Sequence, residues 1–163
     1  MTSPLYSGAT YAEAMVAWLP YKLEQLGLAH LLNDGPFADL GCGLGTVIAT
    51  FQQKYPHIRF IGIDRNRECL DEARKIVSPD TLLIQASLRA ISLRDNSLAV
   101  VFSHKIYQLC NEETYAEIAK EIHRTLRTGG VYFASEPMID YKRPFLELGL
   151  VPMYEKESII FKK

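Results

Sequence analysis

The chain has 163 residues, a suitable length for one domain, and its 48% hydrophobic and 23% charged residues are typical of a globular protein. This composition excludes collagen-like repetition and argues against extended disorder. The formal net charge is −1, so the chain has no overall positive field to attract a polyanion. That balance argues against nucleic acid as the main partner.

The cysteines, the histidines and the amino-terminal residues lead us to expect a cytoplasmic protein without a metal site. The three cysteines are widely spaced and outside any CxxC pattern, which fits a reduced compartment. The four histidines show no ligand spacing, so we expect no metal. The first residues have no basic stretch followed by an apolar core, so we expect no signal peptide. Segment 11–32 carries Glu13, Lys22 and Glu24 and contains Pro20, so we expect no membrane span.

The first 34 residues are predicted to form a helical cap. Apolar residues between positions 12 and 19 recur at helical spacing, and Thr10 is a suitable N-cap. Pro20 is expected to break this helix, and a second helical run should continue from there. The run ends at Asn33-Asp34-Gly35-Pro36, a strong helix breaker.

Strands and helices alternate through residues 35–163. Strands are expected at 37–40, 58–63, 81–85, 98–103 and 131–135, and helices at 46–55, 69–76 and 112–126, the last stopped by Gly129-Gly130. Alternation with short connections indicates a parallel, doubly wound sheet with helices on both faces. The last two candidate strands, 150–156 and 158–161, are too close for a parallel crossover and must form an antiparallel hairpin. We therefore expect a single α/β domain with an antiparallel edge.

The most informative segment is the glycine-rich loop Asp39-Leu40-Gly41-Cys42-Gly43-Leu44-Gly45-Thr46. Glycines let a backbone turn sharply and approach a ligand closely. In parallel sheets such loops lie at the carboxyl ends of the strands, where ligands bind. A turn needed only for packing would explain one glycine, but not three alternating ones.

The spacing of these glycines argues against a dinucleotide. The dinucleotide fingerprint is GxGxxG, and its third glycine would fall at Thr46. A dinucleotide-dependent oxidoreductase is therefore the least favoured of the functions that we consider. Asp64 ends the next expected strand, where a carboxylate can accept hydrogen bonds from both ribose hydroxyls of an adenosyl group. Its alternative role is the N-cap of the helix that begins near Arg67.

Residues 39–46 and 60–64 resemble the first two motifs of the class I S-adenosylmethionine-dependent methyltransferases. The resemblance continues through 95–101, 126–130 and the terminal hairpin, and so covers nearly all of the chain after the first helix breaker. It implies a Rossmann-like, seven-stranded, mostly parallel sheet with one antiparallel strand near its edge. It also implies S-adenosylmethionine as cofactor and S-adenosylhomocysteine as product. The pattern is most similar to the small-molecule branch of the family.

The resemblance assigns a cofactor role to each matching residue. The glycine loop would line the methionine moiety, Asp39 would help to hold its amino group, and Asp64 would bind the ribose. Ser103, at the end of its strand, would face the methyl-bearing sulfonium. The implied cofactor-binding residues are Asp39, Gly41, Cys42, Gly43, Gly45, Asp64, Arg65, Ser87, Leu88 and Ser103.

On the adenine side the chain departs from the family pattern. Arg65 would lie along the adenine, and Ser87 and the backbone N–H of Leu88 would meet its edge. The family commonly has Asp at the position of Ser87, and a serine makes a weaker, neutral contact with the adenine amino group. The family also often has Asp where this chain has Ala99.

The candidate catalytic residues are His104 and Tyr107. Methyl transfer needs the nucleophile, methyl and leaving sulfur held in line, and it needs a base only if the nucleophile arrives protonated. His104 follows the strand that ends at Ser103, and an imidazole ordinarily titrates near neutral pH; the alternative is a loop histidine satisfied by backbone or water. Tyr107 would position a substrate or simply pack. Glu136 would bind a substrate amine or hydroxyl, or cap the next segment.

The acceptor is expected to be a small molecule. The segment after 98–103 lacks the Asn/Asp-Pro-Pro-aromatic sequence of the amide- and adenine-directed enzymes, which argues against methylation of a base amine. An apolar or aromatic substrate is favoured by the cap residues Tyr6, Tyr11, Met15 and Trp18, but such a stripe is also ordinary core. The alternatives are a protein or RNA acceptor, and a non-catalytic cofactor-binding or partner subunit. Homodimerisation is left open, and no membrane partner is expected.

Overall fold

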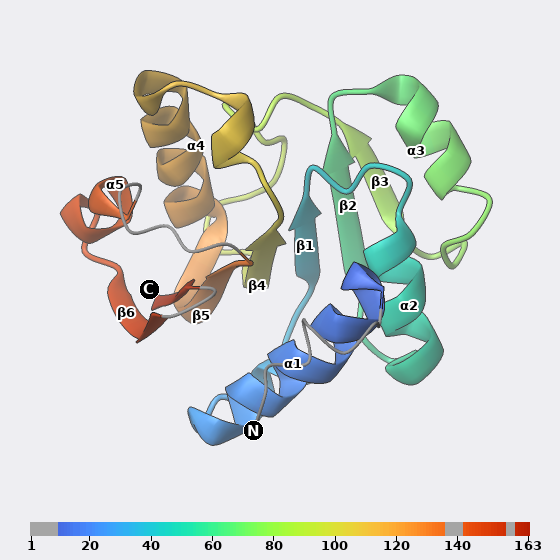
Figure 1. Cartoon of the computed structure of the whole chain (residues 1–163), viewed down its shortest axis with the longest axis horizontal. Coiled ribbons are helices and arrows are strands. Elements are labelled where there is room, and N and C mark those ends of the chain that lie inside the picture. The colour runs from blue at the N-terminus through green and yellow to red at the C-terminus, as the bar shows by residue number, and fades with distance from the viewer. Residues whose placement is uncertain (1–9, 136–141, 156–158) are drawn as a thin grey trace.

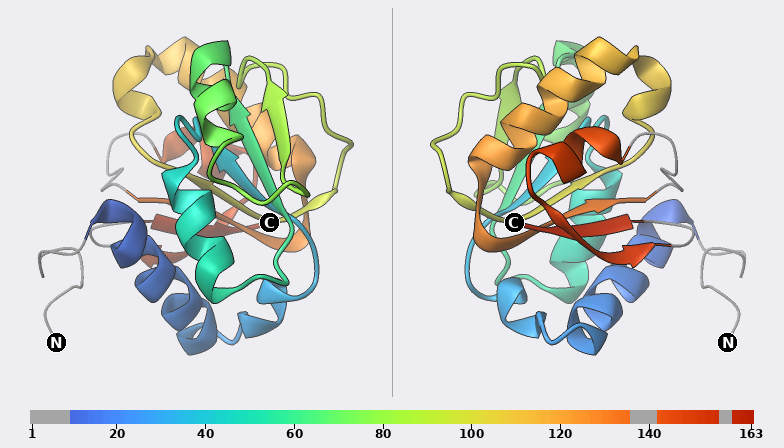
Figure 2. Two further views of the ribbon diagram at one scale, coloured as in Figure 1. Left: turned by 90° about the vertical axis from the view of Figure 1, so that its right-hand side faces the viewer. Right: turned by 90° about the vertical axis from the view of Figure 1, so that its left-hand side faces the viewer.

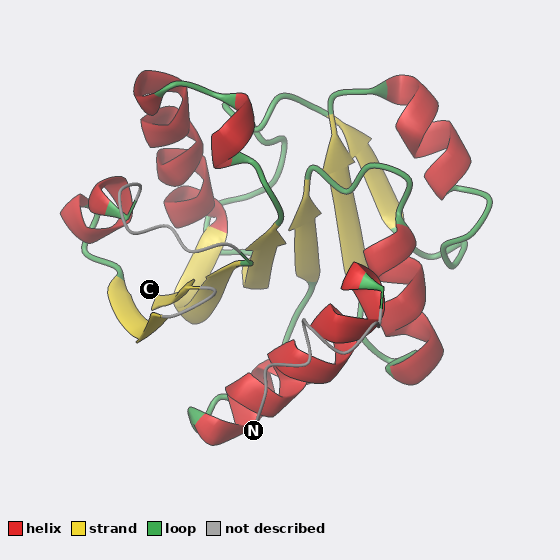
Figure 3. Cartoon of the chain, in the orientation of Figure 1, coloured by secondary structure: helices red, strands yellow, loops and turns green. Residues whose placement is uncertain are grey.

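A computed structural model of the chain describes residues 10–135, 142–155 and 159–163 (Figure 1). Within these residues the strands are β1 (Phe37–Leu40), β2 (Phe60–Asp64), β3 (Leu82–Gln85), β4 (Leu98–Ser103), β5 (Leu126–Ala134), β6 (Val151–Glu155) and β7 (Ile159–Lys162). The α-helices are α1 (Tyr11–Gln25), α2 (Thr46–Lys54), α3 (Arg67–Ala73), α4 (Glu112–Thr125) and α5 (Arg143–Glu147), and the 3-10 helices are η2 (Ala29–Leu32) and η3 (Tyr107–Leu109). Helices flank the strands on both sides (Figure 3).

The described strands form one mixed sheet in the order β3-β2-β1-β4-β5-β7-β6. Strands β1 to β5 pair in parallel, and β7 is antiparallel to both β5 and β6. The predicted doubly wound α/β fold with an antiparallel terminal hairpin is thereby confirmed. The winding reverses between β1 and β4, and in such sheets ligands bind outside the carboxyl ends of the strands at this point.

Two apolar cores lie on opposite faces of the sheet. One core packs α1, η2 and α2 against it, and the other packs α4 and α5 against the opposite face. The side views in Figure 2 show α1 and α4 on opposite sides of the strands. Trp18 of α1 meets Phe133 of β5 with ring centroids 5.0 Å apart, so the first helix is part of the core. None of the described helices combines the length and apolarity that crossing a bilayer requires.

The helix break expected at Pro20 is wrong. Helix α1 begins with a capping box between Thr10 and Glu13 and continues through Pro20 to Gln25. A proline inside a helix removes one backbone hydrogen bond and crowds the preceding turn. Pro20 is buried, and the neighbouring Leu19 and Leu23 are fully buried, so packing of α1 on the sheet offsets this local penalty. The second helical run shrinks to the single turn of η2.

The boundary between α4 and β5 also differs from expectation. The helix ends at Thr125, and the strand begins at Leu126 instead of after Gly129-Gly130. A Cβ at Gly130 would lie only 2.8 Å from the backbone oxygen of Ala99. The glycine therefore lets β5 approach β4 closely, beside a register shift between Leu98 and Val100. Helix α5 was not anticipated, because five residues carry too little periodicity.

Arg124 fastens the long β3–β4 connection to α4. Its guanidinium donates to the backbone oxygens of Ile91 and Leu93 at 2.7 and 2.8 Å. It also pairs with Glu121 and Asp95 at 2.7 Å each. The backbone N–H of Ile91 donates to Glu121 at 2.6 Å, so the loop is held from both directions. This clamp fixes residues 91–95, which follow Ser87 and Leu88 in the same connection.

Replacing Arg124 by methionine should lower the free energy of unfolding by about 1–3 kcal/mol, because two loop carbonyls and two carboxylates lose a charged donor. Urea denaturation measures the effect. The matched control is Arg67→Met, which removes an exposed ion pair with Asp71 and should cost about 0.5 kcal/mol or less. Equal losses in the two variants would contradict the assignment of a clamp.

Candidate active site

The glycine loop lies at the carboxyl end of β1 and is tied to the end of β2. The backbone N–H groups of Gly41 and Cys42 both donate to the carbonyl oxygen of Ile63, at 2.8 and 3.1 Å. Gly41, Gly43 and Gly45 have φ values of 71°, 52° and 76°, a region that side-chain-bearing residues rarely occupy. The alternating glycines are therefore required by the path of the loop.

Asp64 joins this loop to the turn after β2. One carboxylate oxygen accepts from the backbone N–H of Gly43, and the other accepts from that of Asn66, both at 2.9 Å. The N-cap of α3 is Asn66, whose side chain accepts from Glu68 and Cys69, so the alternative role of Asp64 as that cap is wrong. The carboxylate instead lies between two backbone turns at the sheet edge where ligands bind.

The three loop glycines differ in what surrounds them. A Cβ at Gly45 would lie 2.9 Å from the Cβ of Ala73, so this glycine allows α2 and α3 to pack closely. A Cβ at Gly43 would meet nothing within 4 Å, so this glycine borders open space. Cys42 is buried, with its sulfur 2.9 Å from a Cβ placed at Gly62, and burial raises the pKa of its thiol well above the usual range. Only its backbone is therefore suited to meet a ligand.

Asp39 is a buried carboxyl group at the centre of the sheet. The residue is only 5% exposed, and no hydrogen bond from the described residues reaches its side chain. Burial, followed by the nearby negative charge of Asp64, raises the pKa of Asp39 to about 8. A buried carboxyl group without a donor is costly to ionise, so the site favours a cationic ligand group at this position.

His104 lies at the end of β4 between α1 and β5. Its Nδ1 is 2.7 Å from the hydroxyl oxygen of Ser135, and its ring stacks on Tyr11 with centroids 3.8 Å apart. Burial, followed by the charge of Lys105, lowers the pKa of His104 to about 4. The imidazole is therefore neutral at physiological pH and a weak base.

Ser103 turns toward the opposite core. Its hydroxyl oxygen lies 2.8 Å from that of Tyr132 in a buried pair between β4 and β5. The carbonyl oxygen of Ser103 accepts from the backbone N–H of Ser135 at 3.2 Å. The hydroxyl thus already has a structural partner, while the residue itself remains at the carboxyl end of β4.

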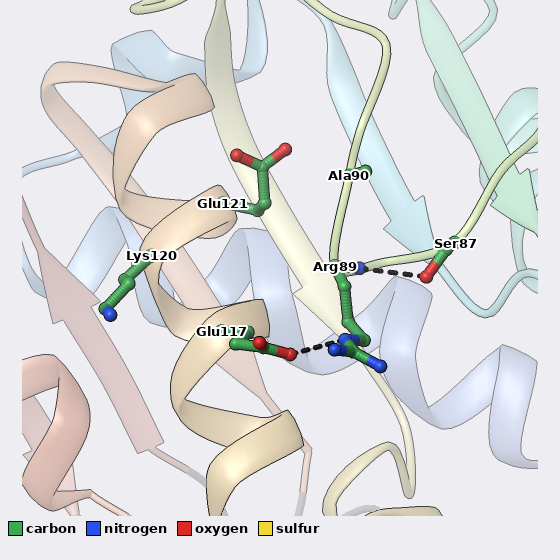
Figure 4. A pocket seen from close by; sticks show the side chains of 6 residues that line it. All are labelled: Ser87, Arg89, Ala90, Glu117, Lys120 and Glu121. Carbon is green, nitrogen blue, oxygen red and sulfur yellow. Dashed lines mark hydrogen bonds and ion pairs between the residues drawn. The ribbon is translucent and has the colours of Figure 1, made fainter.

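The residues expected around adenine lie at the ends of β2 and β3. Arg65 is exposed directly after Asp64, and Ser87 and Leu88 follow β3. Ser87 opens onto a pocket between the β3–β4 loop and α4, shown in Figure 4. In that pocket Arg89 donates its backbone N–H to Ser87 Oγ at 3.3 Å and forms an ion pair with Glu117.

The structure leaves three expected residues without a described side chain. Tyr107 begins η3, four residues beyond β4, but its side chain lies outside the described part of the chain. Tyr6 and Glu136 lie outside the described residues altogether. Among the residues that are described, no cluster of three or more His, Cys, Asp or Glu side chains could hold a metal ion.

Sequence reasoning missed the contact of Ser135 and the conformation of Lys105. Ser135 contacts His104 across 31 positions of sequence, and only the β4–β5 register brings them together. Lys105 adopts a φ of 59°, which no feature of the segment signals. Their one common signal is position, since both follow the carboxyl end of a parallel strand.

Known proteins place the chain in a family. A family model described as a methyltransferase domain matches residues 37–130, more than half of the chain. The chain belongs to this family, which confirms the resemblance seen in the sequence motifs. It is 32% identical over 121 residues to a trans-aconitate 2-methyltransferase of Azoarcus sp. (strain BH72), covering 74% of this chain and 46% of the relative. An uncharacterised protein of Rickettsia prowazekii is 25% identical over 126 residues, 71% of this chain and 50% of that protein.

Solved structures share the fold. A putative sarcosine dimethylglycine methyltransferase from Galdieria sulphuraria has a TM-score of 0.70 at 17% identity, covering 86% of this chain and 62% of that one. Geranyl diphosphate C-methyltransferase from Streptomyces coelicolor A3(2) has a TM-score of 0.65 at 14% identity, covering 91% and 69%. That structure contains Mg²⁺, geranyl diphosphate and S-adenosyl-L-homocysteine. The chain spans no more than about half the length of the curated relatives given above.

Alanine substitutions at Gly43 and Gly45 should lower the free energy of unfolding by different amounts. Gly43→Ala places a Cβ in open space and should cost about 1–2 kcal/mol of stability for its positive φ alone. Gly45→Ala carries a similar backbone cost and also overpacks Ala73, so about 2–4 kcal/mol should be lost. Urea denaturation of both variants checks the difference, and equal losses would contradict the close packing of α2 on α3.

Ionisation of Asp39 should make stability depend on pH. The folded-state pKa of about 8 lies above the ordinary aspartate pKa of 3.8, so the unfolded chain gives up its proton first as the pH rises. The contribution of Asp39 is therefore fully present below about pH 4 and is lost as the pH rises toward 8. In urea denaturation across this range, the advantage of Asp39→Asn over the unchanged protein should grow with pH. Because both proteins share every other titrating group, a constant difference would exclude a raised pKa.

Proposed function

We propose that this chain is an S-adenosylmethionine-dependent methyltransferase acting on a small-molecule acceptor. The observation that carries the proposal is the glycine loop bonded to Asp64 beside the buried carboxyl group of Asp39. This arrangement joins a backbone cradle to two carboxyl groups at the switch point of the sheet. Membership of the methyltransferase domain family and the name of the Azoarcus relative support the same activity.

The loop end of the site suits the methionine and ribose portions of the cofactor. Gly41, Cys42 and Gly43 offer backbone and open space to the methionine moiety, and Asp39 offers a carboxyl group to its ammonium. Each carboxylate oxygen of Asp64 accepts one hydrogen bond from a backbone N–H, and each has a second lone pair that can accept from a ribose hydroxyl. Gly45 supports the loop by allowing α2 and α3 to approach.

The remaining cofactor contacts follow the strand ends. Arg65 would lie along the adenine, and Ser87 with the backbone of Leu88 would meet its edge. Ser103 would border the sulfonium through its backbone, because its hydroxyl is paired with Tyr132. The exposed, neutral Ser87 provides a weaker adenine contact than a carboxylate, so we expect Asp39 and Asp64 to contribute most of the polar binding energy.

Methyl transfer requires the protein mainly to align the acceptor atom with the methyl group of the cofactor. S-adenosylmethionine, when bound, supplies an electrophilic methyl group on a positively charged sulfur. The chain must hold an acceptor atom in line with that methyl and exclude water from it. We propose that His104, fixed by Ser135 and Tyr11, contacts the acceptor as a neutral polar group. Its lowered pKa makes it poorly suited to remove a proton, and Tyr107 is proposed as a further acceptor contact.

Binding of S-adenosylhomocysteine tests the cofactor assignment. The product at about 100 times its dissociation constant should stabilise the folded chain by roughly 2.7 kcal/mol, measured by thermal unfolding. NAD at the same concentration should have no effect, because the loop lacks the dinucleotide spacing. Asp64→Ala should abolish the shift, whereas the matched surface variant Asp71→Ala should retain it.

Circular dichroism before each melt establishes that Asp64→Ala is folded. If it is not, Gly43→Ala serves as the second variant, because it obstructs the open side of the loop without removing a side chain. A folded, unchanged protein that shows no shift at millimolar S-adenosylhomocysteine would overturn the proposal.

A further inference from the structure

Lys105 adopts a backbone conformation that lysine ordinarily avoids. Among the described residues, only Asn96 and Lys105 are non-glycine residues with positive φ, at 53° and 59°. Asn96 belongs to a type that tolerates this region, and its side chain accepts from Lys163 at 2.8 Å. Lysine has no such tolerance, and strained residues of this kind gather at ligand clamps and active sites.

The charge of Lys105 is not neutralised by the described part of the chain. Its side chain is exposed directly after His104, and it is close enough to lower the pKa of that imidazole. No carboxylate of the described residues pairs with its ammonium group. We call the residues that follow β4 and β5, His104, Lys105 and Ser135, the acceptor end of the site; it holds a cation beside two neutral polar groups.

The two ends of the site have opposite electrostatic character. Asp39 and Asp64 lie at the cofactor end and suit the cationic groups of S-adenosylmethionine. Lys105 lies at the acceptor end, where its charge would repel the nearby sulfonium. An anion bound between the two cations would remove this repulsion, whereas a protonated amine would add to it.

The chemistry of the acceptor atom points the same way. His104 is the titratable group that stacking and the contact with Ser135 hold at the end of β4, and it is a weak base. An alcohol or a protonated amine would have to lose a proton before attacking the methyl group. A carboxylate is already deprotonated at neutral pH and needs no base.

We propose that the methyl acceptor is a small carboxylate anion, that Lys105 is the residue that selects it, and that its carboxylate oxygen receives the methyl group. This inference rests on the proposed methyltransferase function. A lone pair of the carboxylate oxygen forms the new O–C bond while the C–S bond breaks and its electron pair stays on sulfur. The products are S-adenosylhomocysteine and a methyl ester that carries one negative charge fewer than the acid, and no proton is transferred.

The experiment uses S-adenosylmethionine labelled in its methyl group, with trans-aconitate, succinate and phenylacetate as probes. The matching neutral amides of succinate and phenylacetate are the controls. Methyl esters release volatile methanol in mild alkali, so the label should be base-labile with at least one acid and absent with the amides. Base-stable label alone, transfer to the amides, or no transfer to any of the three acids would overturn the proposal.

Variants of Lys105 test the selecting role. Lys105→Gln should raise KM for the acid about tenfold or more, because a charge-assisted contact is lost, with a smaller change in kcat. Lys105→Arg should retain most of the affinity. Lys105→Gly should raise KM as Gln does while folding at least as stably, because glycine relieves the positive φ. An unchanged KM in Lys105→Gln and Lys105→Gly would overturn the proposal.

Two controls separate this inference from the function on which it rests. Lys54→Gln alters a lysine in the last turn of α2, where its ammonium lies over the ring of Tyr55, and should leave KM unchanged. S-adenosylhomocysteine should bind Lys105→Gln as it binds the unchanged protein. Binding of S-adenosylhomocysteine without transfer to acids would reject the acceptor class alone, whereas absence of that binding would reject both proposals.

Discussion

The hydrogen bond between the backbone of Gly43 and the carboxylate of Asp64 joins the two turns from which the rest of the site is built. It holds the loop after β1 against the end of β2, where Gly41 and Cys42 already share the carbonyl of Ile63. Three residues with positive φ are needed to follow this path. The position of the loop is thus determined by backbone groups together with the carboxylate of Asp64.

Charge is distributed unevenly over the same sheet edge. Two carboxyl groups lie near the ends of β1 and β2, and one of them is buried deeply enough to retain its proton near neutral pH. At the end of β4 the groups are a neutral imidazole, a hydroxyl and an exposed ammonium. This division suits a reaction between a cationic donor and an electron-rich acceptor, because each partner finds favourable charge at its own end.

Local sequence patterns predicted the features that depend on local forces. Thr10 as a cap, β4 at 98–103 and the terminal hairpin followed from capping chemistry, periodicity and loop length. Continuation of α1 through Pro20 depends on burial of the whole helix, which the residues around the proline do not reveal. The His104–Ser135 contact depends on strand register, and the conformation of Lys105 depends on the turn after β4. Features that depend on strand register or on a single turn therefore escaped the sequence patterns, whereas the glycine loop and its neighbouring carboxylate were visible in them.

The first helix takes part in both the core and the candidate site. Tyr11, at its beginning, stacks on His104, while Trp18, two turns later, packs against Phe133 in the core. A change in the tilt or register of α1 would move both contacts together, because a helix transmits displacement along its axis. The shape of the acceptor end consequently depends on how α1 packs in the core. A variant that accepts a different substrate would have to keep the contact between Trp18 and Phe133 while changing the residues around Tyr11.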